Sequence, residues 1–463
     1  MDHVVMISDI AWIPRGVAKE IPDKIKLTNA ELKELIQGDV PETTDNDDDS
    51  ENEKMEEDED EKPTEGLRGS QPEEVASDQE ETIDDKYLKN FDEVDKQEGM
   101  KGIAVFADNK DDPYVTNHDN SDDEEEEKDD FVIRPTDNLL AVAKIDKNEY
   151  TLEVHVYNEE TGDFYCHHDY ILEAPPLCIE PIFYDPGNEE TSGKGNLVAV
   201  GTMDSEIHIW DLDIVNSCSP FLTLGKKPKT KKRSKRDGSA QGHKDAVISL
   251  AWNKLMEHVM ASGGADKQIV LWDLDECKPA QSISKRNGEV QTIAWHPVES
   301  TFLLAGTMKG TVEVIDCREE AGSASAQWSF ETQIEKVTWN HFNPFTCFVA
   351  GDDGILRYLD MRKPGEVIWE EKAHDGSIGG LVLSTKIRGL LNSFGHDGIM
   401  NTYKLHDDGN IEKVHFTALN LGELHSASFN PDAGTIVAVG GSKEDLVRVL
   451  DLSKHEKIVE SFQ

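Results

Sequence analysis

The sequence has few features of a secreted, membrane-spanning or metal-binding protein. Its six cysteines stand singly, with no Cys-x-x-Cys pair and no Cys/His cluster at zinc-site spacing. No apolar run approaches the roughly 18 residues that a membrane helix needs, and the N-terminus, MDHVVMISDIAWIPRG, has no basic segment followed by an apolar core. We therefore expect a soluble intracellular protein without membrane contact. Its free thiols would be Cys166, Cys178, Cys218, Cys277, Cys317 and Cys347.

Acidic residues outnumber basic ones two to one, 94 to 47, and many of them are concentrated in one region. The formal net charge is −47, and residues 41–130 carry 37 Asp and Glu against 9 Lys and Arg. This charge excludes nucleic-acid binding through the global field, so any such contact needs a local basic patch or a partner. Hydrophobic residues make up only 37% of the chain, which predicts that part of it is unfolded.

An internal repeat runs through the rest of the chain. A short alternating segment ends in Trp-Asp at Trp210 and again at Trp272. The same slot is filled by other residues at Tyr157, Ile315, Leu359, Tyr403 and Leu450. A second marker lies 20 residues before the first in three units, at Trp252, Trp295 and Trp339. In the third unit we expect strands at about 246–252, 258–262, 269–273 and 279–283.

Seven such units predict an all-β fold, a seven-bladed WD40 β-propeller. A single four-stranded blade cannot bury both faces of its sheet, whereas a closed ring of blades buries each face against a neighbour. The period and the two markers in phase indicate this architecture more strongly than any one strand does.

The third unit contains a set of polar residues that is typical of WD repeats. His243 precedes its first strand, Ser262 ends the second, Asp266 lies in the next turn and Trp272 ends the third. We expect these four to form a structural tetrad: a chain of hydrogen bonds from the indole to the hydroxyl, the imidazole and the carboxylate, so that no buried polar atom is unpaired.

A His–Ser–Asp set also occurs in hydrolases, but no GxSxG elbow surrounds the serine here. The structural interpretation is therefore favoured, and we predict no enzyme activity, catalytic residue, cofactor, metal site or small-molecule substrate. The sixth unit keeps His374, Ser393 and Asp397 but has Tyr403 where the third has tryptophan, which predicts a weaker network.

The first unit lacks an innermost strand in its own part of the sequence. The motif at Ala11–Pro14 is similar to the one at Ala294–Pro297, so we expect residues 1–13 to supply that strand. Residues 14–130 would then be an acidic, largely disordered insertion, and residues 131–463 the propeller. The alternative is that the N-terminal strand closes the last blade from outside.

The insertion has several local features. Residues 29–37 have the capping-box spacing of a short helix. Apolar islands at 87–94, 102–106 and 113–115 are either docked on the propeller or used as partner-binding motifs, and the sequence does not separate the two. Three serines have an acidic residue three positions later, the pattern that acidophilic kinases prefer, and are predicted phosphosites. They are Ser50, Ser77 and Ser121.

A second insertion, a basic loop at 225–240, contains eight basic residues in eleven. The leading interpretation is a nuclear-localisation signal, the second a contact with RNA phosphates, and the third a solvated loop. The basic residues are Lys226, Lys227, Lys229, Lys231, Lys232, Arg233, Lys235 and Arg236.

The periodic tryptophans, the acidic insertion and the basic loop together resemble the periodic tryptophan protein 1 family of WD-repeat proteins. The segments that carry the resemblance are AWIPRGVAKEIPDK from Ala11, DDPYVT from Asp111, LEVHVYN from Leu152, WDLDIV from Trp210, AVISLAWNKL from Ala246 and QIEKVTWNHFNP from Gln333. Most of these extend beyond the repeat signature, which by itself indicates little about function.

The resemblance implies a scaffold in the nucleus and nucleolus that acts in large ribosomal subunit biogenesis, through pre-rRNA processing and assembly, with a link to transcription of the rRNA genes. Its partners would be pre-ribosomal assembly factors and pre-rRNA. The alternative is a regulator of transcription that binds chromatin or histones through the acidic insertion.

Overall fold

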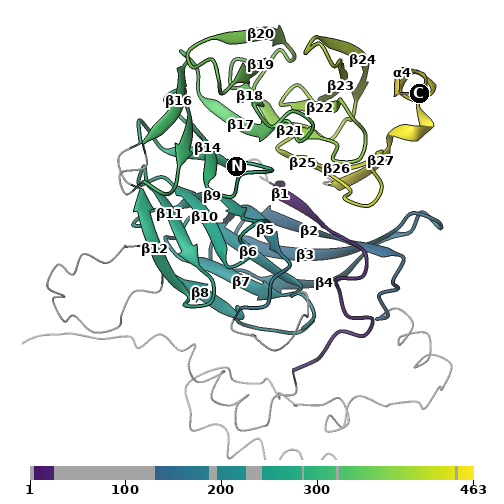
Figure 1. The fold of residues 1–463 in the computed structure, drawn as a ribbon. Coiled ribbons are helices and arrows are strands. Elements are labelled where there is room, and N and C mark those ends of the chain that lie inside the picture. The colour runs from purple at the N-terminus through teal and green to yellow at the C-terminus, as the bar shows by residue number, and fades with distance from the viewer. Residues whose placement is uncertain are drawn as a thin grey trace, which may run out of the picture. The chain divides into compact units, whose positions relative to one another are not determined.

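Seven antiparallel sheets follow one another in the computed structural model, which confirms the predicted all-β, seven-bladed propeller (Figure 1). The structure describes residues 5–25, 131–186, 195–225, 242–283, 286–319, 323–443 and 447–462. These belong to one compact unit, and the second unit, residues 26–120, lies outside the described part. No helix among the described residues has the length and apolar character needed to cross a membrane.

Each sheet is one blade, numbered here in chain order. Blade 1 contains β1 (Val5–Ile13), β2 (Asp137–Asp146), β3 (Glu149–Asn158) and β4 (Phe164–Ile171). Blade 2 contains β5 (Pro176–Ile182), β6 (Leu197–Thr202), β7 (Ile207–Asp211) and β8 (Leu222–Leu224). Blade 3 contains β9 (Val247–Trp252), β10 (Val259–Gly264), β11 (Ile269–Asp273) and β12 (Lys278–Ile283).

Blades 4 to 6 repeat this four-stranded order, and blade 7 has three strands. Blade 4 contains β13 (Val290–Trp295), β14 (Phe302–Thr307), β15 (Thr311–Asp316) and β16 (Ala324–Ser329), and blade 5 contains β17 (Ile334–Trp339), β18 (Thr346–Gly351), β19 (Ile355–Asp360) and β20 (Val367–Lys372). Blade 6 contains β21 (Ile378–Leu383), β22 (Leu390–Gly395), β23 (Ile399–Leu405) and β24 (Ile411–Ala418). Blade 7 contains β25 (Ser426–Phe429), β26 (Ile436–Gly440) and β27 (Val447–Asp451), and a 3₁₀ turn, η1 (Leu452–Lys454), leads to α4 (Glu456–Phe462), which contacts β23 and β24.

Burial along the strands explains their composition. The second strands, such as β14 and β18, are almost continuously apolar and buried, because a neighbouring blade covers each face. The outer strands β16 and β20 alternate or are largely exposed, because solvent reaches one face. The propeller is thus held together between blades as much as within them.

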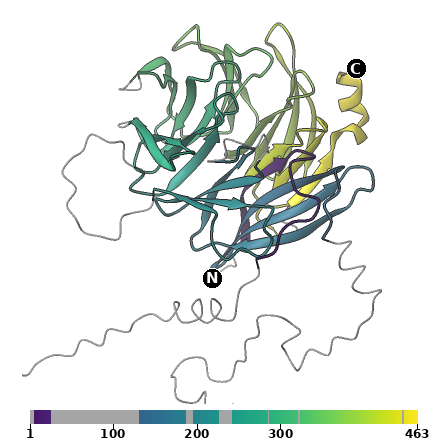
Figure 2. The ribbon, with the colours of Figure 1, turned by 60° about the horizontal axis from the view of Figure 1, so that its bottom comes forward.

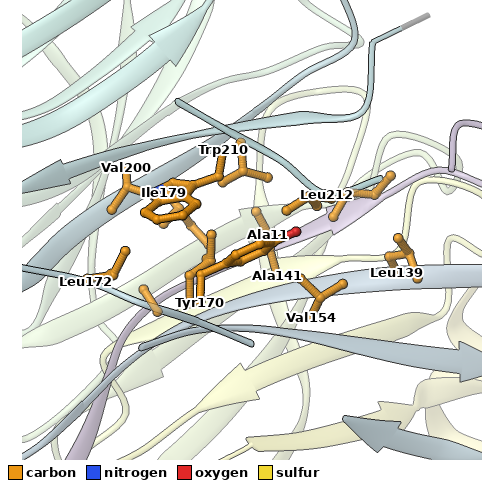
Figure 3. Packing of buried hydrophobic residues seen from close by; sticks show 14 of the residues in the cluster. Ala11, Leu139, Ala141, Val154, Tyr170, Leu172, Ile179, Val200, Trp210 and Leu212 are labelled. Atoms are coloured by element: carbon orange, nitrogen blue, oxygen red, sulfur yellow. The ribbon is translucent and has the colours of Figure 1, made fainter. Parts of the chain in front are cut away.

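A separate apolar cluster fills each junction between neighbouring blades. The cluster between blades 1 and 2 is shown in Figure 3, where Trp210 and Ile179 of blade 2 lie near Tyr170 and Ala141 of blade 1. The rings of Tyr170 and Trp210 are tilted, with centroids 5.0 Å apart. Burial at about 25 cal/mol per Å² of apolar surface makes these seven clusters the main source of stability.

Blade 1 is assembled from both sides of the insertion. β1 pairs antiparallel with β2, from Val5 opposite Asp146 to Ile13 opposite Leu139, and so forms the innermost strand of the sheet. β1 also contacts the innermost strands of blades 2 and 7, β5 and β25. Figure 2 shows this purple strand beside the blue strands of blade 1 and the yellow strands of blade 7. β1 therefore closes the ring.

Three of the periodic tryptophans connect neighbouring blades through their indole N–H groups. Each lies at or beside the end of an innermost strand and donates a hydrogen bond to a backbone carbonyl on the preceding innermost strand. The bonds run from Trp12 to Ser428 (3.0 Å), from Trp295 to Ala251 (3.0 Å) and from Trp339 to Ala294 (3.1 Å). The tryptophan period is thus also the period of the contacts between blades.

Candidate functional site

The four polar residues of blade 3 lie within hydrogen-bond distance of one another. The indole of Trp272 donates to the Ser262 hydroxyl (2.7 Å), which contacts Nε2 of His243 (2.7 Å), and Nδ1 of His243 contacts the Asp266 carboxylate (3.1 Å). Burial alone would raise the pKa of Asp266, but the interaction with His243 and the backbone hydrogen bonds from Lys244 and Gln268 together outweigh it, and the pKa is lowered. The carboxylate thus fixes the imidazole tautomer and the hydroxyl orientation.

Blade 6 contains the same set with one change. His374 contacts Ser393 (2.7 Å) and Asp397 (3.0 Å), and burial lowers the pKa of His374 despite the nearby carboxylate. The phenol oxygen of Tyr403 is buried without a hydrogen-bond partner of good geometry. The bond from the aromatic residue of the third strand is therefore missing in blade 6, where Nδ2 of Asn401 instead lies 3.2 Å from Nε2 of His374.

Replacing Ser262 with alanine is expected to destabilise the protein more than the matched change at Ser393. Both hydroxyls are fully buried, but Ser262 bonds both an imidazole and an indole. We expect a loss of about 1–3 kcal/mol for Ser262→Ala, because two buried groups lose their partner, and a smaller loss for Ser393→Ala. Urea unfolding of the full-length variants measures both losses, and equal losses would contradict the role of the indole bond.

The basic residues at 226–236 lie outside the described residues, but both ends of their loop are described. Gly225, which follows β8, has a φ of +85°, and Gly242 lies against it. A Cβ atom would lie 3.3 Å from the Trp272 ring at Gly225 and 3.0 Å from it at Gly242. The two ends therefore meet on Trp272, and the blade 3 tetrad holds the base of the basic loop.

The chain beyond β1 continues along blades 1 and 2. Residues 14–25, here called the arm, form a parallel bridge between Asp23 and Ile214. The arm's backbone donates to Asp213 and Asn216 side chains of blade 2, with Lys19 N to Oδ1 of Asp213 at 3.0 Å. The arm therefore ends beside the β7–β8 connection, at the opposite end of β8 from the basic loop.

A cavity of about 590 Å³ lies where the described chain resumes after the insertion. Residues 131–137 form one wall, and β3 and β4 supply the rest, including Val156, Tyr165 and His167. The arm lies close by, since Ile133 donates its N–H to the Glu20 carbonyl (2.9 Å). Sequence reasoning did not identify this cavity, because its walls come from separate segments of the chain and form no motif.

Blade 1 also brings together three side chains that can ligate metals: Glu153, His155 and Cys166, whose ligand atoms lie within 4.8 Å of one another. Lys144 already pairs with Glu153 at 2.8 Å, and burial raises the pKa of the Cys166 thiol to about 11. Both features oppose cation binding, and we interpret the cluster as an ion-pair network. The cluster escaped sequence analysis because His155 and Cys166 meet by pairing of β3 with β4.

Comparison with known proteins shows which family this chain belongs to. The WD domain, G-beta repeat family model matches residues 235–273, which contain the tetrad. The chain is 33% identical to the periodic tryptophan protein 1 homolog of Drosophila melanogaster, over 98% of this chain and 95% of that protein. This chain belongs to the periodic tryptophan protein 1 family. The resemblance seen in the sequence is thereby confirmed.

Two fungal relatives extend the comparison. Periodic tryptophan protein 1 of Saccharomyces cerevisiae is 29% identical over 99% of this chain and 90% of its own length. An uncharacterised WD repeat-containing protein of Schizosaccharomyces pombe is 29% identical over 99% of this chain and 91% of its own length. The periodic tryptophan protein 1 family is a family of WD40 propeller scaffolds, a class that is typically non-enzymatic.

The predicted phosphosites Ser50, Ser77 and Ser121 lie outside the described residues.

Proposed function

We propose that this member of the periodic tryptophan protein 1 family is a nucleolar scaffold in large ribosomal subunit biogenesis. It would act in pre-rRNA processing and assembly and contact assembly factors and pre-rRNA, with a link to transcription of the rRNA genes. The observation that carries the proposal is the match to family members over nearly the whole chain, insertions included. Shared repeats alone would not support it.

The geometry of the platform supports a bridging role. The acidic insertion follows Ile25, which bonds Asn216 before β8, and the basic loop follows Gly225 after β8. Two segments of opposite charge thus leave opposite ends of one strand of a closed ring. We infer that one segment serves basic proteins and the other serves nuclear import or RNA phosphates.

Sedimentation of nuclear extract tests the proposal. Full-length tagged protein is expected to migrate with pre-large-subunit particles and to return to the top of the gradient, where a free chain of 51.7 kDa remains, after RNase treatment. An unrelated WD propeller with the same tag serves as the control. A peak that stays at the top without RNase would contradict the proposal, and co-purification with nucleosomes after RNase would favour the chromatin alternative.

A further inference from the structure

Blade 7 has an open outer edge in the described part of the chain. Its third strand, β27, pairs only with β26, whereas the third strand of every other blade also pairs with a fourth strand. After β27 the chain turns through η1 into α4, which packs against β23 and β24 of blade 6 and adds no strand to this edge (Figure 1). All five residues of β27 are half-buried, whereas β15 of blade 4 is buried throughout. An exposed edge of this kind is a template for pairing with a further strand.

The junction between blades 7 and 1 lacks a contribution that the other six junctions share. Each of those includes an apolar side chain from the fourth strand of the blade that precedes it. These side chains are Tyr170, Leu224, Ile283, Trp328, Trp369 and Val414. Between blades 7 and 1, the outermost apolar side chains that blade 7 supplies among the described residues are Val447 and Val449 of β27, and both are only partly buried. The repeat therefore predicts an apolar strand outside β27.

The side of blade 1 that faces this position has incompletely buried apolar side chains at both ends of β4. Phe164 and Ile171 lie opposite Tyr157 and Thr151 of β3. Paired residues of antiparallel strands share a face, and Tyr157 belongs to the cluster between blades 7 and 1. Thr151 lies an even number of positions before Tyr157 and so faces the same way. Ile171 is 79% exposed and Phe164 is partly buried, and a strand beside β27 would lie over this face.

The polar side chains between the two ends of this face are already paired. Lys144 and His155 lie 2.8 and 3.0 Å from carboxylate oxygens of Glu153. Burial raises the pKa of the Cys166 thiol to about 11, so the thiol is neutral. A strand that covers this face therefore leaves no charge there without a partner.

One segment of the acidic insertion has the composition of such a strand. Residues 102–106, GIAVF, carry no charge, and Ile, Val and Phe favour strands. The segment has the same length as β27, and alternation would place Ile103 and Val105 on one face. The other two apolar islands fit less well, since 87–94 contains three charged residues and 113–115 begins with proline, which has no N–H to donate.

The insertion leaves enough chain for this segment to reach β27. The described chain resumes at Phe131, whose carbonyl oxygen lies 3.2 Å from Nε2 of His167 on β4, the outer strand of the blade beside blade 7. The 24 residues at 107–130 can span roughly 80 Å when extended, far more than the length of one strand. A tether of this kind holds the segment at an effective concentration of about millimolar, which favours it over a strand of another protein.

We propose that residues 102–106 form the fourth strand of blade 7, antiparallel to β27. The backbone of this strand pairs with the outer edge of β27, and one of its faces packs on Phe164 and the neighbouring part of β4. Blades 7 and 1 then share a second contact in addition to β1. This proposal goes beyond the scaffold function and does not depend on it, because it concerns contacts within this chain alone.

Residue-resolved hydrogen exchange of β27 in the full-length protein tests the proposal. The amides of an antiparallel strand point alternately to its two sides, so about two or three of the five should face the outer edge. We expect these amides to be protected in the wild type. In the triple variant Ile103→Ser, Val105→Ser and Phe106→Ser they should exchange at least about tenfold faster, because the strand no longer packs on blade 1. Slow exchange in β18 checks that the ring of the variant is folded.

A matched control and a rescue experiment show which segment is responsible. The triple variant Tyr87→Ser, Leu88→Ser and Phe91→Ser, in another apolar island, should leave the β27 amides protected. A synthetic peptide of residues 100–109, added in excess to the first variant, should restore their slow exchange.

Three results would overturn the proposal. The first is exchange in wild-type β27 that is as fast as in the Ile103, Val105 and Phe106 variant. The second is equally slow exchange in both proteins, which would mean that another part of the chain covers the edge. The third is fast exchange in the pure protein that becomes slow only in purified pre-large-subunit particles, which would assign the edge to a strand of another protein.

Discussion

Replacing the eight basic residues of the loop with alanine is expected to leave the protein in the cytoplasm. A run of this density in a chain of net charge −47 is a typical import signal, and Gly225 and Gly242, at the two ends of the loop, lie against Trp272. The substituted residues are Lys226, Lys227, Lys229, Lys231, Lys232, Arg233, Lys235 and Arg236. Fluorescence microscopy of tagged full-length protein measures the nuclear fraction, which should fall severalfold.

The matched control changes the other three residues of the same segment, Pro228, Thr230 and Ser234, to alanine and should remain nuclear. Unchanged nuclear accumulation of the eightfold variant would argue against the import interpretation. An unrelated import signal fused to the eightfold variant then separates the two remaining roles. If the fusion regains the nucleus and migrates with pre-ribosomal particles, the loop serves import. If it regains the nucleus but not the particles, the loop contacts RNA phosphates.

The repeat could be predicted from the sequence because the patterns that mark it lie within short segments of the chain. Each third strand of a blade is a short apolar-rich segment with a marked position near its end, so Trp210, Trp272 and Leu450 could be aligned without knowledge of the ring. The tetrad was readable for the same reason, since its four residues occupy fixed positions in one unit. The basic residues and the phosphosites could be identified from composition alone, and they remain predictions because they lie outside the described residues.

The remaining features depend on contacts between separate segments of the chain. The arm has no regular apolar pattern, and its partners Asp213 and Asn216 lie about 190 residues away. The cavity at Phe131 exists only where residues 131–137 pass over β3 and β4. Glu180 on β5 is a further example: burial raises its pKa to about 7, and its carboxylate accepts the backbone N–H of Trp252 in blade 3. The contact between Glu180 and Trp252 is not evident from the periodicity of the sequence.

The junction between blades 7 and 1 has the largest expected effect on stability, because no short chain connection spans it. Trp12 is buried there with Ile436 and Ala438, and its indole bond reaches Ser428 across 416 residues of sequence. Asp9 accepts from Ser426 of blade 7 (2.6 Å) and from Ile179 of blade 2 (3.0 Å) and so connects three blades. Separating blades 7 and 1 is therefore the easiest way for the ring to open.

Trp12→Ala is expected to cost about 3–5 kcal/mol, from the lost apolar contacts and the cavity left behind. The matched control is Trp339→Ala, because Trp339 is also buried and donates the same kind of bond, to the Ala294 carbonyl, but between blades 4 and 5, which are adjacent in sequence. Both variants should lower the urea midpoint, but only Trp12→Ala should speed hydrogen exchange in β26 and β2 at low denaturant. Trp12→Phe, which keeps most of the volume and loses the indole bond, should cost about 1 kcal/mol. Exchange in β26 that is as slow in Trp12→Ala as in Trp339→Ala would show that β1 is not what holds the ring closed.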